Sequence, residues 1–415
     1  MLPQNYLVHR RTGDDDNDDD DEDENEGGMD RSMRRRGRLT GAVAGGTPTA
    51  VAVPSAAPPL GVTGVLCDTH SLFIRGRGNL QYTVFRPRYV RMKPPLVCLA
   101  GGPYLPWQYL STLVHLVNDR SLVFFDPIGC GQSKRVEEHR QNLSNQPEKT
   151  SPMATAKDSP ALSTEEKLST NPIPDMVHDL VQLIQHLQLQ HYHLYGHSFG
   201  GIVAYEALAQ QGKMPGTCLS LILSSTPANL LMALQEIDHL KAALAPEAAT
   251  IKEHDDPDHA LSRLFAERHE CRVRPLPVQL QQSFAMAGFS SSPAGWQSVK
   301  DYVVEPPSHD TEKIQIPLFL LRGEFDFISE ECMDPWWDCV AATKEESDKD
   351  GGRRVGSSNG RPITTLPNVA HYGMLEDEEG YGVVLRAFLA RVAEPALQIP
   401  KAPPGPLKGR SRLPR

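Results

Sequence analysis

The sequence has no apolar stretch long enough to cross a membrane, and its first 30 residues contain no apolar run. A membrane-spanning helix needs about 18 apolar residues, and a secretory signal needs a shorter apolar segment after a basic start. Organelle transit peptides avoid acidic residues, which are abundant in this region. These absences predict a cytoplasmic protein without a membrane partner.

Closely spaced cysteine pairs are also missing. The seven cysteines are odd in number, and none of them forms a C-x-x-C pair. Disulfide frameworks usually carry an even number of cysteines, and structural zinc sites use such pairs. We therefore expect a reduced intracellular protein that needs neither a metal nor another cofactor.

The chain has no excess of basic residues, and its net charge of -10 argues against a nucleic-acid partner. Much of the negative charge lies in residues 14–26, which are followed by a basic cluster at 31–38. Like charges repel one another and prevent packing. We predict a disordered tail at 1–61 and a second, basic tail at 396–415, and leave their protein partners open.

Strand-like apolar runs alternate with helical patterns in two blocks, which predicts a mostly parallel, doubly wound α/β sheet. The first block covers 62–227 and the second 312–395, and the chain between them, 228–311, reads as a helical cap. Two low-complexity segments, 135–172 and 345–361, read as surface insertions. The expected strands are 71–75, 80–86, 95–99, 121–125, 191–195, 219–224, 316–322 and 363–366, and helices are expected at 107–117 and 380–392.

The strongest chemical signal is Gly196-His-Ser-Phe-Gly200, a G-x-S-x-G between a predicted strand and a predicted helix. A serine on such a tight turn is held in a strained conformation that exposes its hydroxyl, and the flanking glycines make room for the neighbouring backbone. The motif predicts an α/β-hydrolase fold with Ser198 as the nucleophile. His197 reads as a structural residue whose side chain points away from Ser198.

A serine nucleophile needs a base to take its proton and an acid to hold that base. In this fold the acid and then the histidine follow the serine at the ends of later strands. Asp326 follows the strand 316–322 and His371 follows the strand 363–366, so we expect them to complete a catalytic triad. Glu324 is the competing acid.

The oxyanion formed during acyl transfer needs two N–H donors. One is expected from Phe199, the residue after the nucleophile. The other is expected from the Gly-Gly-Pro turn after the strand 95–99, where we favour Gly102 over Gly101. Aromatic residues near these positions are expected to line an apolar acyl pocket, although each can equally be a core residue: Tyr104, Trp107, Phe199 and Tyr372.

Together these segments resemble the proline iminopeptidase family, including its archaeal tricorn-interacting aminopeptidase branch. Ala100-Gly-Gly-Pro-Tyr104 stands where the family has H-G-G-P-G, and Asp126-Pro-Ile-Gly-Cys-Gly-Gln-Ser133 stands where it has D-Q-x-G-x-G-x-S. The cap run 265–272 and the Gly323-Glu-Phe-Asp326 segment are similar too. The resemblance implies a metal-independent serine exopeptidase that removes an N-terminal residue, often proline, from a small peptide.

The sequence departs from this family where the family binds the substrate's amino group. Family members use an acid directly after the catalytic aspartate and another in the cap, but here Phe327 and the stretch 288–293 carry none. Another acid, Glu267, Glu270 or Glu324, can substitute. Otherwise the substrate is an amide, ester or lactone without a free amine. A non-catalytic hydrolase-fold binding module is the third hypothesis.

Overall fold

The computed structural model describes residues 64–88, 93–135, 171–210, 212–251, 257–287, 296–341 and 362–395. The predicted tails and most of the predicted insertions, 135–172 and 345–361, lie outside these described residues. So does the cap stretch 288–293. Within the described ranges, no helix is long and apolar enough to span a bilayer.

The described strands form one nine-stranded sheet with the order β1-β2-β4-β3-β6-β7-β8-β9, and β5 pairs with β2. All pairs from β4 through β9 along this order are parallel, and the pairs made by β2 are antiparallel. This confirms the predicted mostly parallel sheet. The strands are β1 (Val65–Ile74), β2 (Gly78–Pro87), β3 (Leu96–Leu99), β4 (Leu122–Phe125), β5 (Lys134–Arg135), β6 (His191–His197), β7 (Thr217–Ser224), β8 (Leu318–Gly323) and β9 (Thr364–Leu366).

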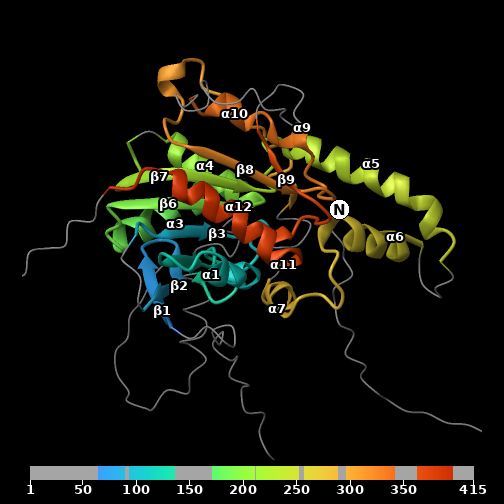
Figure 1. Cartoon of the computed structure of the whole chain (residues 1–415), viewed down its shortest axis with the longest axis horizontal. Coiled ribbons are helices and arrows are strands. Elements are labelled where there is room, and N and C mark those ends of the chain that lie inside the picture. Colours follow the sequence, from blue (N-terminus) through green and yellow to red (C-terminus); the bar gives the residue numbers. More distant parts are fainter. Residues whose placement is uncertain are drawn as a thin grey trace, which may run out of the picture. The chain divides into compact units, whose positions relative to one another are not determined.

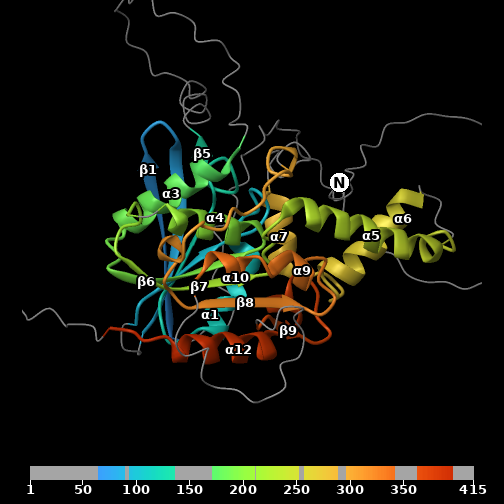
Figure 2. The same cartoon turned by 90° about the horizontal axis from the view of Figure 1, so that it is seen from above.

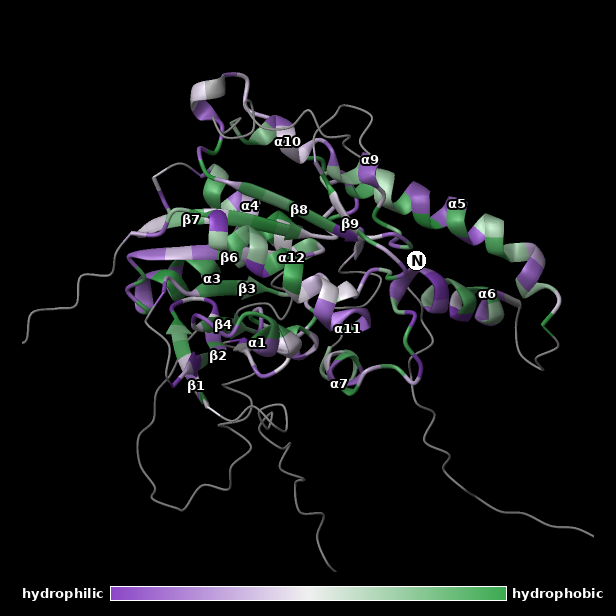
Figure 3. Ribbon diagram, viewed as in Figure 1, coloured by the Kyte–Doolittle hydropathy of each residue, from purple (hydrophilic) through white to green (hydrophobic). Residues whose placement is uncertain are grey.

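Helices cover both faces of this sheet, which explains the continuous apolar runs of its central strands. In β3, Val97 and Leu99 belong to one core cluster, while Leu96 and Cys98 belong to the other. Helices α3 (Ile173–His186) and α4 (Phe199–Ala209) cover the first face, and α1 (Leu113–Leu116) and α12 (Glu378–Arg391) the second (Figure 2). The hydropathy colouring shows β3 and β8 as hydrophobic along most of their length (Figure 3).

The described helices between β7 and β8 lie mainly between residues 230 and 286. Helix α5 begins after Asn229, whose side chain accepts a hydrogen bond from the Met232 N–H at 3.0 Å. Figure 1 shows α5, α6 and α7 beyond one end of the strands, on the side where β8 and β9 end. These helices are α5 (Leu230–Ala248), α6 (Pro257–Phe265), the π-helix η2 (Ala266–Glu270) and α7 (Val278–Met286).

Three local predictions differ from the structure. Strand β1 begins at Val65 rather than at residue 71, because polar residues are tolerated in an edge strand whose outer face is exposed. The predicted helix 107–117 is a 3₁₀-helix η1 (Trp107–Thr112) followed by the single turn α1. The two-residue strand β5 was not predicted, because its sequence shows no strand-like apolar pattern. The remaining elements are η4 (Asp310–Glu312), α9 (Glu330–Met333), α10 (Trp336–Cys339) and α11 (Gly373–Glu376).

Candidate active site

Ser198 lies between β6 and α4, where its backbone has φ 53° and ψ −127°. A residue other than glycine in this left-handed region is strained by about 1–3 kcal/mol and needs support from its surroundings. The support is close packing of strand and helix: a Cβ on Gly196 would lie 2.3 Å from the Gly201 Cα, and one on Gly200 would lie 2.4 Å from the Ala100 carbonyl oxygen. Local sterics therefore require all three glycines around this serine.

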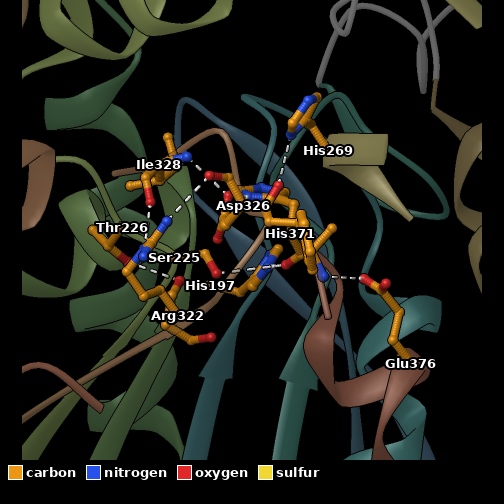
Figure 4. Close-up of polar contacts among 12 residues, drawn as sticks. His197, Ser225, Thr226, His269, Arg322, Asp326, Ile328, His371 and Glu376 are labelled. Carbon is orange, nitrogen blue, oxygen red and sulfur yellow. Dashed lines mark hydrogen bonds and ion pairs between the residues drawn. The ribbon is translucent and has the colours of Figure 1, made fainter. Parts of the chain in front are cut away.

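Asp326 and His371 are brought together from the ends of β8 and β9. The His371 Nδ1 donates to the Asp326 Oδ1 at 2.8 Å, and both side chains are buried (Figure 4). Because Nδ1 faces the carboxylate, the other ring nitrogen, Nε2, is the one able to accept a proton. This pairing is the one expected from the order of strands.

Arg322 stabilises the turn that carries Asp326. The Arg322 Nε donates to the Ile328 carbonyl at 2.8 Å, and its Nη2 donates to the Asp326 carbonyl at 3.2 Å. The Ile328 N–H donates to the Asp326 Oδ1 at 2.9 Å. Burial acts to raise the pKa of Asp326, but His371 and then Arg322 outweigh it, and the pKa lies below its usual value. The acid is therefore ionised at neutral pH.

The loop that carries His371 is attached both to the nucleophile's strand and to the cap. The His197 Nε2 donates to the His371 carbonyl at 2.9 Å, so the residue preceding Ser198 touches this loop directly. Glu376 accepts from the Ala370 N–H at 3.1 Å and, through its other oxygen, from the cap's Arg272 N–H at 3.0 Å. The expected serine, aspartate and histidine thus lie on three neighbouring loops at one edge of the sheet.

The Gly-Gly-Pro turn passes directly against the nucleophile. A Cβ on Gly101 would lie 3.1 Å from the Ser198 Cβ. The Gly101 N–H donates to the Tyr109 hydroxyl at 2.7 Å, so it is already engaged in a buried hydrogen bond. Phe199 is the first residue of α4, with its N–H at the start of the helix. This geometry favours Gly102 over Gly101 as the second oxyanion donor.

Three of the four aromatic residues predicted to line an acyl pocket, Tyr104, Trp107 and Tyr372, lie in different surroundings. Trp107 stacks on Phe124 at 4.9 Å between ring centroids and meets Phe85 edge-on at 6.0 Å, which makes it a core residue, the alternative that the sequence had left open. Tyr104 belongs to the other core cluster, with its side chain interacting with Arg135. Tyr372 alone lies at the site, with its ring 5.3 Å from that of His371.

Phe327, the residue after Asp326, stacks on the His371 ring at a centroid distance of 4.2 Å and an angle of 28°. On its other side it lies 6.0 Å from the ring of Phe265, which comes from the cap helix α6. One face of the imidazole therefore packs against an aromatic ring.

Of the three alternative acids, Glu270 is the one buried beside His371. The residue is 9% exposed, and its Oε1 has no hydrogen-bond partner among the described residues. Burial raises the pKa of Glu270, and the nearby charge of His371 opposes the rise. Glu324 instead accepts from the Asn368 N–H at 2.8 Å in an exposed loop, and Glu267 lies 3.6 Å from Arg274 at the surface.

Glu270 is fixed in place because the π-helix η2 and the residues after it are joined to both catalytic loops. The Tyr372 N–H donates to the Glu270 carbonyl at 3.1 Å, and the His269 Nδ1 donates to the Phe325 carbonyl at 2.9 Å. The Arg272 guanidinium lies 4.0 Å from the centre of the Phe325 ring. A π-helical turn of this kind is frequent at functional sites.

Two residues of the site had not been identified from the sequence. Tyr109 lies in an apolar segment that reads as ordinary core, and no local pattern marks its hydroxyl. Arg322 did carry a signal, because an arginine at the end of an apolar strand must find buried acceptors. No group of three His, Cys, Asp or Glu side chains suited to a metal ion occurs among the residues that the structure describes.

The Asp126–Ser133 motif is structural in this protein. Asp126 is buried and accepts from the Trp107 N–H at 3.3 Å and from the Gln132 N–H at 3.0 Å. Burial raises the pKa of Asp126 to about 6, and these two donors limit the rise. The Ser133 hydroxyl donates to the Asp126 carbonyl at 2.8 Å, which closes the turn.

Residues 94–335 match the model of the alpha/beta hydrolase fold family, so the chain belongs to this family. It is 25% identical over 313 residues to a proline iminopeptidase of Lactobacillus crispatus, a match that spans 72% of this chain and 90% of the relative. A proline iminopeptidase of Lactobacillus helveticus is 25% identical over 268 residues, covering 61% and 81% of the two chains. The resemblance inferred from the motifs is thereby confirmed.

Solved structures support the same fold. VinJ superimposes with a TM-score of 0.56 at 20% identity, over 79% of this chain and 99% of its own. A proline iminopeptidase of Mycobacterium smegmatis gives a TM-score of 0.55 at 21% identity, over 78% and 98%. At such identities the likeness establishes the architecture alone.

Proposed function

We propose that this α/β-hydrolase is a serine hydrolase that works through an acyl-enzyme. Ser198 attacks the carbonyl carbon while His371 takes its proton, and Asp326 orients the imidazole and stabilises its charge. The N–H groups of Gly102 and Phe199 bind the oxyanion. His371 then protonates the leaving group, and water hydrolyses the acyl-enzyme by the same steps. The Asp326–His371 pair at the sheet edge that carries the strained serine supports this mechanism.

As the reaction, we propose the release of an N-terminal residue, proline or another, from small peptides. The observation that carries this proposal is the buried, unpartnered carboxylate oxygen of Glu270 beside His371. A buried carboxylate without a partner is unfavourable, and a substrate ammonium group satisfies it. Its place next to the catalytic imidazole would put the amine near the scissile bond. The proline iminopeptidase relatives agree with this assignment.

A second candidate is the hydrolysis of amides, esters or lactones whose acyl group carries no amine. The observation that favours it is Phe327 stacked on His371, where the related aminopeptidases have an acid. An aromatic wall there favours an apolar acyl group. The candidates differ in one property, the requirement for a free amine.

A fluorophosphonate probe and a matched substrate panel test both levels of the proposal. The probe should label the wild-type chain and leave Ser198→Ala unlabelled; equal labelling of the two would refute the nucleophile. Cleavage of a prolyl arylamide but not of its N-acetylated form supports the aminopeptidase. Turnover of short acyl esters alone supports the second candidate.

A further inference from the structure

A chain of three buried hydrogen bonds runs behind Ser198 and joins the loops around it. The Gly101 N–H lies 2.7 Å from the Tyr109 hydroxyl, the hydroxyl lies 2.9 Å from the His197 Nδ1, and the His197 Nε2 lies 2.9 Å from the His371 carbonyl. Gly101 belongs to the oxyanion turn, His197 precedes the nucleophile, and His371 is the proposed base. One tyrosine and one histidine therefore connect the oxyanion turn, the end of the nucleophile's strand and the loop that carries the base.

The direction of each hydrogen bond is fixed from both ends of the chain. A backbone N–H only donates, so the Tyr109 oxygen accepts from Gly101 and its own proton must go elsewhere. The His197 Nδ1 is the acceptor within reach. At the other end a backbone carbonyl only accepts, so the His197 Nε2 must carry a proton. Both ends require the same neutral tautomer, with Nε2 protonated and Nδ1 free to accept.

The surroundings of His197 keep it in this neutral form. Its side chain is buried, and the rings of Tyr109, Tyr372 and His371 lie 5.3, 5.5 and 4.7 Å from its own. Burial, followed by the charge of His371, lowers the pKa of His197 to about 3, against the opposing charge of Asp326. A cation would also give the Tyr109 oxygen a second incoming donor and leave its own proton without an acceptor.

We propose that Tyr109 and His197 are positioning residues, which hold the oxyanion turn and the His371 loop at a fixed spacing around Ser198. Neither residue touches the reacting atoms. The Tyr109 hydroxyl accepts a hydrogen bond from the Gly101 N–H and so anchors the turn. The next N–H, that of Gly102, is left to bind the oxyanion. His197 holds the backbone of the base. This inference rests on the proposed serine-hydrolase function.

Removing the Tyr109 hydroxyl tests this role. In Tyr109→Phe the oxyanion turn loses its anchor and His197 loses its donor, so groups that act in the transition state are displaced. We expect kcat to fall about 10- to 100-fold, less than the loss of a whole oxyanion donor, with KM changed less than about two-fold. Tyr192→Phe is the matched control, because the Tyr192 hydroxyl donates to the Pro215 carbonyl at 3.1 Å near the start of β6, the strand that ends at His197.

The control variant should keep its wild-type kcat. If Tyr109→Phe also keeps kcat within about two-fold, the positioning role is refuted. If Tyr109→Phe does not fold, two substitutions of His197 decide instead. His197→Gln retains a donor where Nε2 lies, and His197→Asn retains an acceptor where Nδ1 lies. Each should lower kcat about ten-fold or more at constant KM, and unchanged kcat in both would refute the proposal.

A spectroscopic measurement tests the hydrogen-bond chain without any substrate. In ¹⁵N-histidine-labelled protein, with the His197 signals identified from their loss in His197→Gln, Nε2 should be protonated and Nδ1 unprotonated between about pH 5 and pH 8. The opposite tautomer, or a cation in this range, would overturn the inferred directions. This measurement does not depend on the fluorophosphonate comparison of wild type with Ser198→Ala. Failure of the inferred hydrogen-bond chain and failure of the proposed function can therefore be told apart.

Discussion

Replacing Glu270 by glutamine separates the amine-binding role from a structural one. Glutamine keeps the size of the side chain and removes its charge. In the wild-type chain the carboxylate is buried, has one unpartnered oxygen, and lies near the charges of His371, Lys241 and Arg274. The substitution should therefore weaken the binding of a substrate ammonium group and at the same time relieve the cost of a buried charge.

The expected loss of activity follows from the burial of the pair. Truncating one partner of a buried charge pair costs about 2–5 kcal/mol, and about 3 kcal/mol lowers kcat/KM on a prolyl arylamide roughly 100-fold. Turnover of a short acyl ester, which has no ammonium group, should stay within about two-fold of wild type if the chain cleaves such esters. The ratio of the two activities therefore isolates the contribution of the Glu270 charge to substrate binding.

Glu270→Gln should raise the thermal stability of the protein while it lowers the activity. Burying a charge is costly, so its removal should stabilise the fold, and a gain of about 1 kcal/mol raises the Tm by about 2 °C. Because burial raises the pKa of Glu270, ionisation opposes folding as the pH rises above the unfolded value of about 4.3. The gain in Tm for Glu270→Gln should therefore be absent below about pH 4 and grow as the pH rises from the unfolded pKa through the raised native pKa.

Kinetics on the two substrates and thermal melting across pH measure these effects. The matched control is Glu267→Gln, in the same π-helix, because the Glu267 side chain is 34% exposed and pairs with Arg274. This control should match the wild type in both activities. Equal loss of both activities in Glu270→Gln would assign the residue a structural role, and no loss of either would refute the amine site.

Three further predictions concern the catalytic loops. Asp326→Asn keeps the size of the acid but no longer stabilises the tautomer and charge of His371, so kcat should fall about 10³- to 10⁴-fold with an unchanged circular dichroism spectrum; retained activity would exclude Asp326 as the acid. Gly101→Ala places a Cβ 3.1 Å from the Ser198 Cβ, and slower fluorophosphonate labelling by about ten-fold is expected, whereas a wild-type rate would show that the turn can yield. Glu376→Gln leaves one oxygen where two backbone N–H groups need acceptors, so chemical denaturation should show a loss of about 1–3 kcal/mol, and an unchanged midpoint would contradict the bridging role.

The sequence alone was sufficient where the determining interactions are local. The G-x-S-x-G segment, its strand and its helix are contiguous, and the close contact of Gly196 with Gly201 is set within a few residues. The positions of Asp326 and His371 followed from a rule of topology, that parallel strands end at one edge of the sheet. The apolar runs predicted the central strands for a similar reason, because burial on both faces removes polar residues from them.

The proposed amine site could be located only in the tertiary structure, because it is built from segments that are distant in the chain. Three acids were equal candidates in the sequence, and only the docking of the cap onto the two catalytic loops placed Glu270, rather than Glu267 or Glu324, beside the imidazole.

The sequence alone also did not determine where the aromatic side chains near the site point, for the same reason. Trp107 and Tyr372 are both aromatic residues near predicted loops, yet one packs against β2 and β4 and the other against His371. Periodicity indicates which residues are buried, whereas the neighbours of a buried side chain are decided by packing between elements.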